Sequence, residues 1–318
     1  MRFSVIIPLY NKAPYVAKAI QSVLNQTFTD YELIIVDDGS RDNSESIAAK
    51  AIEGQSNSRL VKQENAGVSV ARNNGVTASQ GDFLCFLDAD DWWEPTFLEE
   101  MSKLIIGYPD AGIYGTNYTV VNETKHKTHI AHLGVEDGFE SGYINYCQVY
   151  AKTLAMPLWT GAVCVPRSVF VEMGGFPKGI KLGEDFLLWI RIALKYNVVL
   201  LNKPLSYYNQ DVEVLNRGVG RLHNPQEHML WNLGFLEEEE ETNPDYKRLT
   251  DNLRTYGLLP YYLSKEYHDA AKRELAKVDW KRQPAKTLLQ YQQPLALARM
   301  GYALRKTGSR CKQWLLRS

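Results

Sequence analysis

Residues 83–91 read FLCFLDADD, an apolar run that ends on three carboxylates, and this stretch decides how the chain is interpreted. The apolar part is typical of a short buried strand. Open α/β folds bind ligands at the carboxyl edge of the sheet, where such a strand would place Asp88, Asp90 and Asp91. Asp88 and Asp90 would share one face if the strand continued. Because crowded carboxylates favour a hard cation, the stretch predicts a site for Mg²⁺ or Mn²⁺ and a diphosphate.

The same acids could instead cap a helix. Residues 92–98 read WWEPTFL, which is typical of a helix start, with a proline near the first position and acids in the first turn. Both interpretations stay open from this stretch alone, so the choice depends on the neighbouring segments.

Strands and helices alternate along the first 90 residues. The apolar periodicity predicts buried strands at residues 3–9, 32–36, 59–63 and 82–87, and helices at residues 14–26, 42–51 and 68–78. Strands joined by single helices imply a mostly parallel sheet built from right-handed crossovers. The fold class is therefore α/β.

Polar residues follow each predicted strand, at residues 10–11, 37–38, 65–67 and 88–90. Because the carboxyl ends of parallel strands meet at one edge, we expect a ligand cleft there. The chain contains no Gly-x-Gly-x-x-Gly after its first strand and no Gly-x-x-x-x-Gly-Lys-Ser/Thr. Their absence disfavours a dinucleotide dehydrogenase and a P-loop NTPase.

Several residues of this edge have chemistry that suits a nucleoside diphosphate, although each also has a purely structural interpretation. Asp38 could accept hydrogen bonds from a base or ribose, or form an Asx-turn. Arg72 could stack on a base or pair with phosphate, or lie on the surface of its helix. Asn65, Gly67 and Asn73 could supply short polar contacts and a close backbone approach.

Composition indicates an ordinary globular protein of 318 residues, with 45% hydrophobic residues, 23% charged residues and a net charge of −1. Nothing in this balance indicates nucleic-acid binding. Apolar runs such as VVLL at 198–201 are too short to span a bilayer, and the N-terminus resembles a strand rather than a signal peptide. The four cysteines (Cys85, Cys147, Cys164 and Cys311) lack Cys-x-x-Cys spacing, which is typical of reduced thiols in a cytoplasmic protein.

An ordered series of motifs resembles that of the family 2 glycosyltransferases. The segments are VIIPLYN at 5–11, IIVDDGS at 34–40, NAG at 65–67, ARNNG at 71–75 and FLDADD at 86–91. A second block, GGF at 174–176 and GEDFLLW at 183–189, extends the resemblance to about residue 210. The resemblance implies a GT-A fold, with a mostly parallel nucleotide-binding sheet flanked by helices. We expect this domain at residues 1–222, with a nucleotide-binding half (1–95) and an acceptor half (96–222), and a helical C-terminal region at 223–318.

The resemblance also implies a nucleotide-sugar donor, a divalent metal and inversion at the anomeric carbon. It assigns Asp185 as the general base and Asp90, with Asp88, as metal ligands. Expected nucleotide contacts are Pro8, Tyr10, Asp38, Asn65, Gly67, Arg72, Asp88 and Ala89.

The chemistry of a single displacement agrees with these roles. An attacking hydroxyl needs a positioned carboxylate to take its proton, and the leaving diphosphate needs a cation on the opposite side of the sugar. Asp185 lies far along the chain from Asp90 and can meet that demand. Asp185 could instead be the N-cap of a helix at 186–195, and Glu184 is the alternative base.

Other candidates are less specific. Trp159 and Thr160 could form the floor of the sugar site, and Trp93 could shape the donor pocket, although large aromatics also fill cores. His223 follows the basic segment RGVGR at 217–221 and could be a further metal ligand or an ordinary surface histidine.

The C-terminal region offers no motif with a known chemistry. We expect helices at residues 225–241, 246–263 and 265–277. Residues 284–318 contain basic and apolar side chains and no acidic one. The segment 294–318 could therefore lie peripherally on the inner face of the cell membrane, or pack on its own domain.

The sequence as a whole predicts an inverting glycosyltransferase of the hexosyl-transferring type. It would move one sugar from a UDP-linked donor to a hydroxyl of a saccharide or lipid-linked acceptor in surface polysaccharide or lipid-linked glycan assembly. The Gln-x-x-Arg-Trp motif and membrane spans of the family's processive synthases are missing, which favours single addition. A nucleotidyltransferase and a non-catalytic nucleotide-sugar-binding protein are the alternatives. The donor sugar, the acceptor and the oligomeric state are not predicted.

Overall fold

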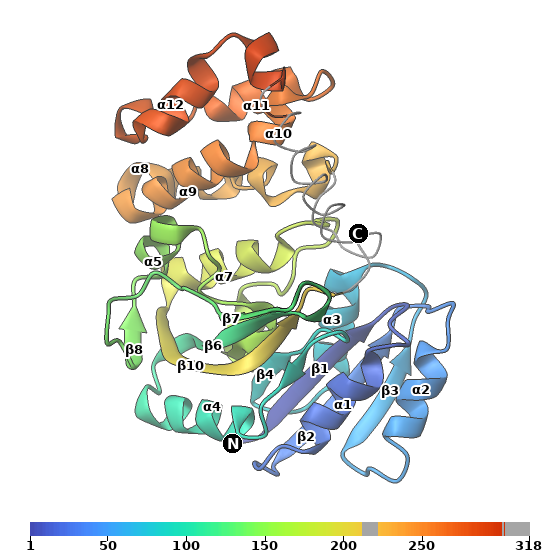
Figure 1. Cartoon of the computed structure of the whole chain (residues 1–318). Coiled ribbons are helices and arrows are strands. Elements are labelled where there is room, and N and C mark those ends of the chain that lie inside the picture. The colour runs from blue at the N-terminus through green and yellow to red at the C-terminus, as the bar shows by residue number, and fades with distance from the viewer. Residues whose placement is uncertain (212–221, 301, 303–318) are drawn as a thin grey trace. The chain divides into compact units, whose positions relative to one another are not determined.

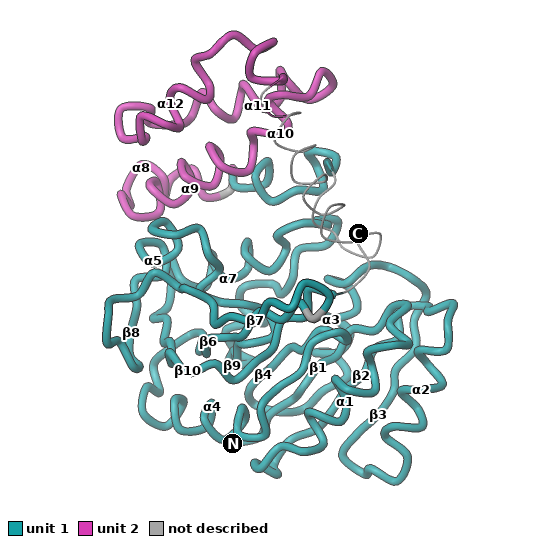
Figure 2. The backbone as a smooth tube through the Cα atoms, viewed as in Figure 1, with its two compact units in different colours: residues 1–233 teal, residues 234–318 magenta. Residues whose placement is uncertain are grey.

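The computed structural model describes residues 1–211, 222–300 and 302. It divides into two compact units, residues 1–233 and 234–318, whereas the sequence placed the change in character at residue 222 (Figure 2). Among the described residues, no helix is both long and apolar enough to cross a bilayer. The basic segment 217–221, and residues 301 and 303–318 of the expected membrane segment, lie outside the described part of the chain.

A ten-stranded mixed sheet forms the centre of the first unit, in the order β3-β2-β1-β4-β9-β6-β10-β5, with β7 paired to β6 and β8 to β10 (Figure 1). The strands are β1 (Phe3–Leu9), β2 (Tyr31–Asp37), β3 (Ser58–Lys62), β4 (Phe83–Phe86), β5 (Trp92–Trp93), β6 (Ala111–Asn122), β7 (Lys127–Ile130), β8 (Ser141–Ile144), β9 (Val163–Pro166) and β10 (Asn197–Asn209). The helices of this unit are α1 (Val16–Leu24), α2 (Ser44–Ala51), α3 (Val68–Ala78), α4 (Phe97–Gly107), α5 (Tyr146–Thr153), α6 (Arg167–Glu172) and α7 (Glu184–Lys195).

The predicted parallel arrangement is confirmed for β3, β2, β1 and β4. These strands, and the helices α1, α2 and α3 that connect them, begin and end within two residues of the expected bounds. The rest of the sheet is mixed. Strand β9 runs antiparallel between β4 and β6, and it pairs Cys164 with Cys85. Strand β9 therefore connects the parallel strands β1–β4 to the second half of the sheet, which begins with β6.

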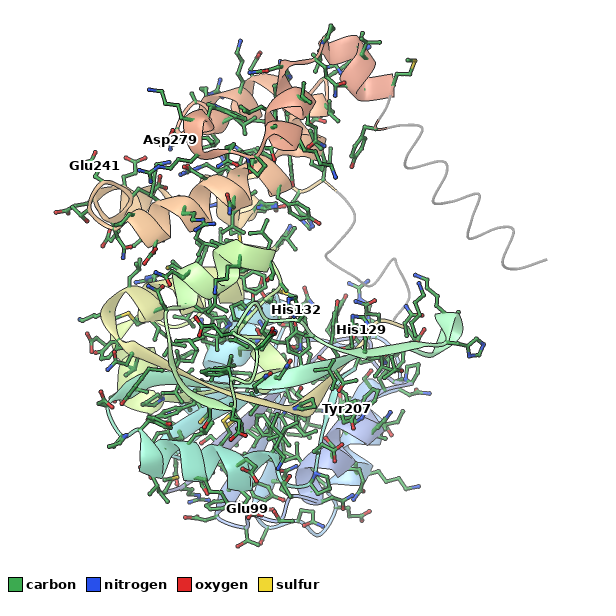
Figure 3. The ribbon with its side chains drawn as sticks, turned by 60° about the vertical axis from the view of Figure 1, so that its left-hand side comes forward. Glu99, His129, His132, Tyr207, Glu241 and Asp279 are labelled. Carbon is green, nitrogen blue, oxygen red and sulfur yellow. The ribbon has the colours of Figure 1, made fainter. Side chains whose placement is uncertain are left out.

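A helix starts within residues 92–98, as expected, but the first two residues of this stretch are not part of it. Trp92 and Trp93 form the short strand β5, which pairs with Tyr207 and its neighbour Ser206 in β10. Trp92 also stacks on Tyr207, with ring centroids 5.1 Å apart. Tyr207 is labelled in Figure 3. Helix α4 begins only at Phe97, because the two tryptophans find strand partners that local sequence does not reveal.

Successive side chains of β1 point to opposite faces of the sheet, as the two-residue repeat of a strand requires. Ile7 packs in a core cluster with Ile20 of α1 and Phe97 of α4. Ile6 faces α3, where a Cβ on Gly75 would come within 2.5 Å of its Cγ2. Gly75 thus allows α3 to lie close to β1, with the first turn of the helix at the carboxyl edge of the sheet.

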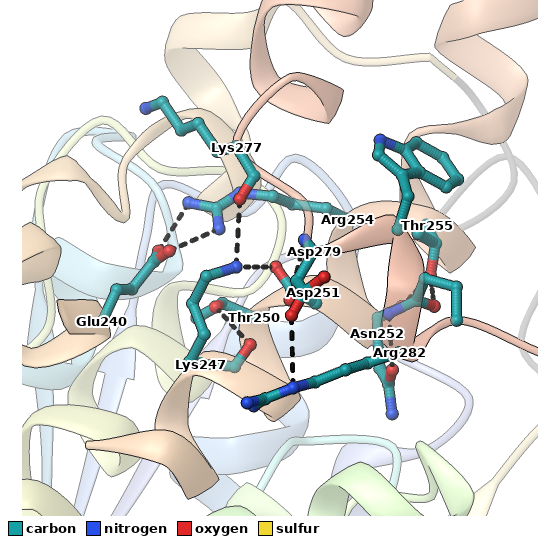
Figure 4. Close-up of polar contacts among 12 residues, drawn as sticks. Glu240, Lys247, Thr250, Asp251, Asn252, Arg254, Thr255, Lys277, Asp279 and Arg282 are labelled. Atoms are coloured by element: carbon teal, nitrogen blue, oxygen red, sulfur yellow. Dashed lines mark hydrogen bonds and ion pairs between the residues drawn. The ribbon is translucent and has the colours of Figure 1, made fainter. Parts of the chain in front are cut away.

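The second unit is helical, with α8 (Glu237–Thr242), α9 (Pro244–Gly257), α10 (Leu259–Leu263), α11 (His268–Leu275) and α12 (Ala285–Gln292). Its interior contains ion pairs (Figure 4) as well as buried apolar side chains such as Leu249. Arg254 is fully buried and donates to both carboxylate oxygens of Glu240, at 2.6 and 2.8 Å. Lys247 pairs with Asp251 and donates to the Lys277 carbonyl.

The helix expected at residues 225–241 is wrong in its first part. The structure has short 3₁₀ turns at Pro225–Glu227, Met229–Trp231 and Gly234–Leu236 before α8 begins. The helix expected at 246–263 is divided between α9 and α10 at Leu258.

Candidate functional site

A cleft of about 540 Å³ opens at the carboxyl ends of β1, β2 and β4. Its lining includes twelve of the predicted site residues: Pro8, Tyr10, Asp38, Asn65, Gly67, Arg72, Asp88, Ala89, Asp90, Trp159, Glu184 and Asp185. Six carboxylates line this cleft (Asp38, Asp88, Asp90, Asp91, Glu184 and Asp185), against three cationic side chains (Lys12, Arg72 and Lys181). The described lining therefore has more negative than positive groups.

The loops after β1 and β2 hold each other at one end of the cleft. Asn11 adopts a left-handed conformation with φ of 50°, and its amide donates to the Ser40 hydroxyl at 3.1 Å. The amide of Lys12 donates to the Ser44 hydroxyl at 2.7 Å. These bonds fix the backbone on which Tyr10 and Lys12 enter the lining.

Asp38 organises the loop before α3. Its carboxylate accepts hydrogen bonds from the side chains of Gln63 (2.7 Å) and Asn65 (3.1 Å) and from the amides of Ala66 (2.8 Å) and Gly67 (2.9 Å). The donors come from the third strand's tip and not from the residues that follow Asp38. The Asx-turn alternative is therefore wrong for this side chain, which instead places Asn65 and Gly67 at the cleft.

Arg72 joins two segments that are far apart in the sequence. Its guanidinium pairs with Asp88 at 2.7 Å and with Glu184 at 3.0 Å, and only 4% of its side chain is exposed. Burial acts against its charge, but the two neighbouring carboxylates outweigh burial and raise the pKa of Arg72. Arg72 is thus a buried bridge across the cleft, and the surface alternative is wrong.

The acidic tip after β4 lies in a turn, because the strand ends at Phe86. Burial raises the pKa of Asp90, and Asp88 adds to this effect, although the Lys12 ammonium lies 2.5 Å from Asp90 and opposes it. Burial also raises the pKa of Asp91 well above its usual range, with a further contribution from repulsion by Asp90 and Asp88. The tip therefore concentrates negative charge where water cannot fully screen it.

Asp91 differs from its two neighbours because it faces the interior. It is 2% exposed, and its carboxylate accepts bonds from the Asn209 amide (2.8 Å) and the Trp159 indole (3.3 Å). It thereby connects the acidic tip to the end of β10 and to one aromatic wall of the cleft. Sequence reasoning grouped Asp91 with the tip but gave it no role.

Two more carboxylates of the cleft lie at the start of helix α7. Its N-cap is Gly183, which has φ of 82°, so Glu184 and Asp185 are the first two helical residues. The alternative in which Asp185 caps this helix is therefore wrong. Asp185 accepts bonds from the Thr160 hydroxyl at 2.5 Å and from the Phe186 amide at 2.9 Å.

Both carboxyl groups of α7 titrate above their ordinary range. Burial and repulsion from Asp185 raise the pKa of Glu184 to about 7, although Arg72 opposes the shift. Burial likewise raises the pKa of Asp185, while Arg72 and the Thr160 hydroxyl oppose it. Perturbed carboxyls in a cleft are typical of acid–base sites.

Three predicted residues are not among the described lining of the cleft. Thr160 is 1% exposed and donates its hydroxyl to Asp185, which does line the cleft. Trp93 is 3% exposed, stacks on Phe97 and donates its indole N–H to the Gly161 carbonyl at 2.6 Å, so it belongs to the core. His223 is buried close enough to His228 to lower that residue's pKa, in addition to the larger effect of burial.

The donor set at the acidic tip fits a hard divalent cation. Carboxylate oxygens are the ligands that Mg²⁺ and Mn²⁺ prefer, and Asp88 and Asp90 line the cleft at the end of one strand. The excess of carboxylates over cations around them would also favour such an ion. Within residues 1–211 and 222–300, however, no group of three or more His, Cys, Asp or Glu side chains is arranged to hold a metal ion.

Comparison with known proteins identifies one family. A family model described as Glycosyl transferase family 2 matches residues 4–163. The glycosyltransferase GlyA of Streptococcus pneumoniae is 34% identical over 215 residues, which are 65% of this chain and 30% of that protein. The uncharacterized glycosyltransferase YibD of Escherichia coli is 43% identical over 105 residues, 33% of this chain and 30% of that protein. The matched region thus spans about a third of the length of these relatives.

Solved structures resemble this chain over most of its length. TarS 1–349 of S. aureus, in complex with UDP-GlcNAc, has a TM-score of 0.73 at 19% identity, covering 97% of this chain and 92% of that one. The mannosyltransferase PcManGT of Pyrobaculum calidifontis, in complex with GDP-Man and Mn²⁺, has a TM-score of 0.50 at 18% identity, covering 89% and 88%. At these identities the likeness concerns the fold.

Proposed function

This chain belongs to glycosyl transferase family 2, and we propose on that premise that it transfers one sugar from a nucleotide-sugar donor to an acceptor hydroxyl with inversion. The expected GT-A fold is confirmed by the likeness to TarS. The observation that carries the proposal is the pairing of Arg72 with both Asp88 and Glu184. Through this one side chain, the acidic tip and the start of α7 face the same cleft.

The donor would be a nucleoside diphosphate sugar, with UDP as the first candidate. Support comes from two structural relatives, one in complex with UDP-GlcNAc and the other with GDP-Man and Mn²⁺. In this chain Tyr10, Asp38 and Arg72 would contact the nucleotide, since all three line the cleft. Asp90 and Asp88 would hold a divalent cation, which acts as a Lewis acid toward the leaving diphosphate.

Asp185 is the general base in this proposal. The acceptor oxygen forms its bond to the anomeric carbon as the bond to the diphosphate breaks, and the hydroxyl proton passes to the Asp185 carboxylate. Bonds from Thr160 and the Phe186 amide orient that carboxylate. Glu184 is less suited to the same task because its carboxylate is ion-paired with Arg72.

Surface polysaccharide or lipid-linked glycan is the proposed acceptor class, and a cytoplasmic enzyme in peripheral contact with the membrane would suit such an acceptor. A screen of nucleotide sugars tests the donor side without knowledge of the acceptor. We expect release of UDP from one UDP-sugar by slow hydrolysis, faster with Mn²⁺ than with EDTA. Absence of nucleotide release and of nucleotide binding for every donor would contradict the proposal.

Asp90→Ala is expected to abolish the gain in UDP affinity that Mn²⁺ provides, which should be about tenfold or more in the wild type. The change removes a carboxylate from the tip while leaving the strand β4 intact. Calorimetry with UDP, with and without Mn²⁺, measures the difference. Asp137→Ala, an exposed acid outside the cleft lining, is the control. Mn²⁺ dependence retained in Asp90→Ala would show that the cation is held elsewhere.

A further inference from the structure

The two carboxylates of the Asp-x-Asp tip are each engaged by a cation of the protein itself. Asp88 pairs with Arg72 at 2.7 Å, and Asp90 pairs with Lys12 at 2.5 Å. Both carboxylates that would hold the metal are thus already paired with a cationic side chain in the described part of the chain. A divalent ion that binds Asp90 would therefore meet an ammonium group already in place.

The two protein cations differ in how firmly they are held. Arg72 is 4% exposed and has a second carboxylate partner in Glu184, so its guanidinium is fixed from two sides. The Lys12 side chain is 17% exposed, and its ammonium sits at the end of a flexible four-carbon stem. Its backbone is anchored, because the Lys12 amide donates to Ser44. The ammonium can therefore move while its point of attachment stays in place.

We propose that Lys12 is the internal counter-cation of Asp90, which competes with the divalent metal for that carboxylate and is released to the donor's diphosphate when the metal binds. The inference rests on the proposed function and adds a role for a residue that sequence reasoning missed. The basis is electrostatic: an ammonium and a divalent cation repel each other at one carboxylate, whereas a diphosphate brings negative charge that can accept the displaced ammonium. Lys12 lines the same cleft as Asp90, so it stays within reach of the ligand.

This arrangement makes metal and nucleotide bind cooperatively. Without nucleotide, the metal must displace Lys12 with no compensating partner for the ammonium, so it binds weakly. With nucleotide, the ammonium has a new partner and the metal gains Asp90. By linkage, each ligand then raises the affinity for the other by the same factor.

Mn²⁺ binding, followed by the EPR signal of the free ion, tests the proposal with and without UDP. Lys12→Met removes the charge and keeps the length of the side chain, Lys12→Arg keeps the charge, and Lys50→Met changes an exposed lysine of α2. We expect Lys12→Met to bind Mn²⁺ about tenfold more tightly than the wild type in the absence of UDP. We also expect UDP to increase its Mn²⁺ affinity by a correspondingly smaller factor. Lys12→Arg and Lys50→Met should behave as the wild type.

The outcomes separate this inference from the proposed function. Unchanged or weaker Mn²⁺ binding by Lys12→Met, with UDP still bound, would overturn the role of Lys12 and leave the proposed function intact. The same holds if Lys12→Arg behaves as Lys12→Met, since charge would then not be the cause. Failure of Lys12→Met to fold, judged by circular dichroism, would show that the Lys12–Asp90 ion pair is needed for the fold. That result would overturn the proposal that Lys12 is released when the metal binds. Failure of the wild type to bind UDP with or without Mn²⁺ would overturn both proposals.

Discussion

Asp185→Asn is expected to lower the rate of sugar transfer by about 10²-fold or more while UDP binds with nearly wild-type affinity. Asparagine keeps the size of the side chain and can still accept a hydrogen bond from Thr160, which donates to Asp185 at 2.5 Å. It cannot take up the acceptor's proton. The loss should therefore appear in the chemical step and not in donor binding. Calorimetry with UDP and the rate of nucleotide release from the identified donor measure the two quantities.

Glu184→Gln is the matched control for this substitution, since it neutralises the adjacent carboxylate of the same helical turn. We expect it to retain much more transfer activity than Asp185→Asn. A larger loss in Glu184→Gln, with Asp185→Asn still active, would move the base to Glu184.

The pH profile gives an independent check on the base. A base acts only when ionised, so transfer should fall as pH decreases through its pKa. Because burial raises the pKa of Asp185, the acidic limb of kcat/KM should lie above the range of an exposed aspartate. The same limb should be absent from the residual activity of Asp185→Asn.

Arg72→Met is expected to lower the free energy of unfolding by about 3 kcal/mol at pH 8, because it leaves the buried Glu184 carboxylate and the partly exposed Asp88 carboxylate without their cation. Asp88 and Glu184 both pair with this guanidinium, and Glu184 is 8% exposed. Denaturant titration measures the loss. Lys62→Met, which removes an exposed ion pair with Glu45, should cost less than about 1 kcal/mol.

The loss in Arg72→Met should shrink as the pH is lowered from 8 to 6. The pKa of Glu184 is already raised to about 7, and removing the Arg72 charge raises it further. A carboxyl whose folded pKa exceeds its unfolded pKa makes the folded state bind protons more readily, so folding gains stability as pH falls toward the unfolded pKa. A loss below 1 kcal/mol at both pH values would mean that the buried bridge contributes little.

The first half of the fold could be predicted from sequence because its signals are local. Strands and helices alternate within about the first 90 residues, and a single helix connects each strand to the next parallel strand. The cleft edge followed from the same pattern, since polar residues at the ends of parallel strands must meet. Tyr10, Asp38 and Asp88 are positioned by that rule, and all three line the cleft.

Residues positioned by distant contacts could not be predicted in this way. Trp93 joins a strand whose partner lies beyond residue 200, so its place in the core has no local signal. The only sequence signal for His223 was the basic segment that precedes it at residues 217–221, and this signal does not predict that the side chain is buried. The pairing of Lys12 with Asp90 spans 78 positions. A signal for Lys12 existed, because it is a basic residue directly after a polar strand tip, but its carboxylate partner depends on the folded sheet.

Strand β9 also constrains the order in which this protein can mature on the ribosome. Strands β3, β2, β1 and β4 can pair once residues 1–90 have emerged, but β4 then has an open edge until Val163–Pro166 is synthesised. The Glu184 partner of Arg72 follows 112 positions after the arginine, a delay on the order of ten seconds at typical rates of chain elongation. Until β9 has been synthesised, the apolar strand β4 exposes unpaired backbone donors and acceptors, the feature by which sheets aggregate. A nascent chain that stalls before residue 163 would therefore be a substrate for chaperones, and the edge of β4 would be closed before Glu184 and Asp185 complete the acidic cleft.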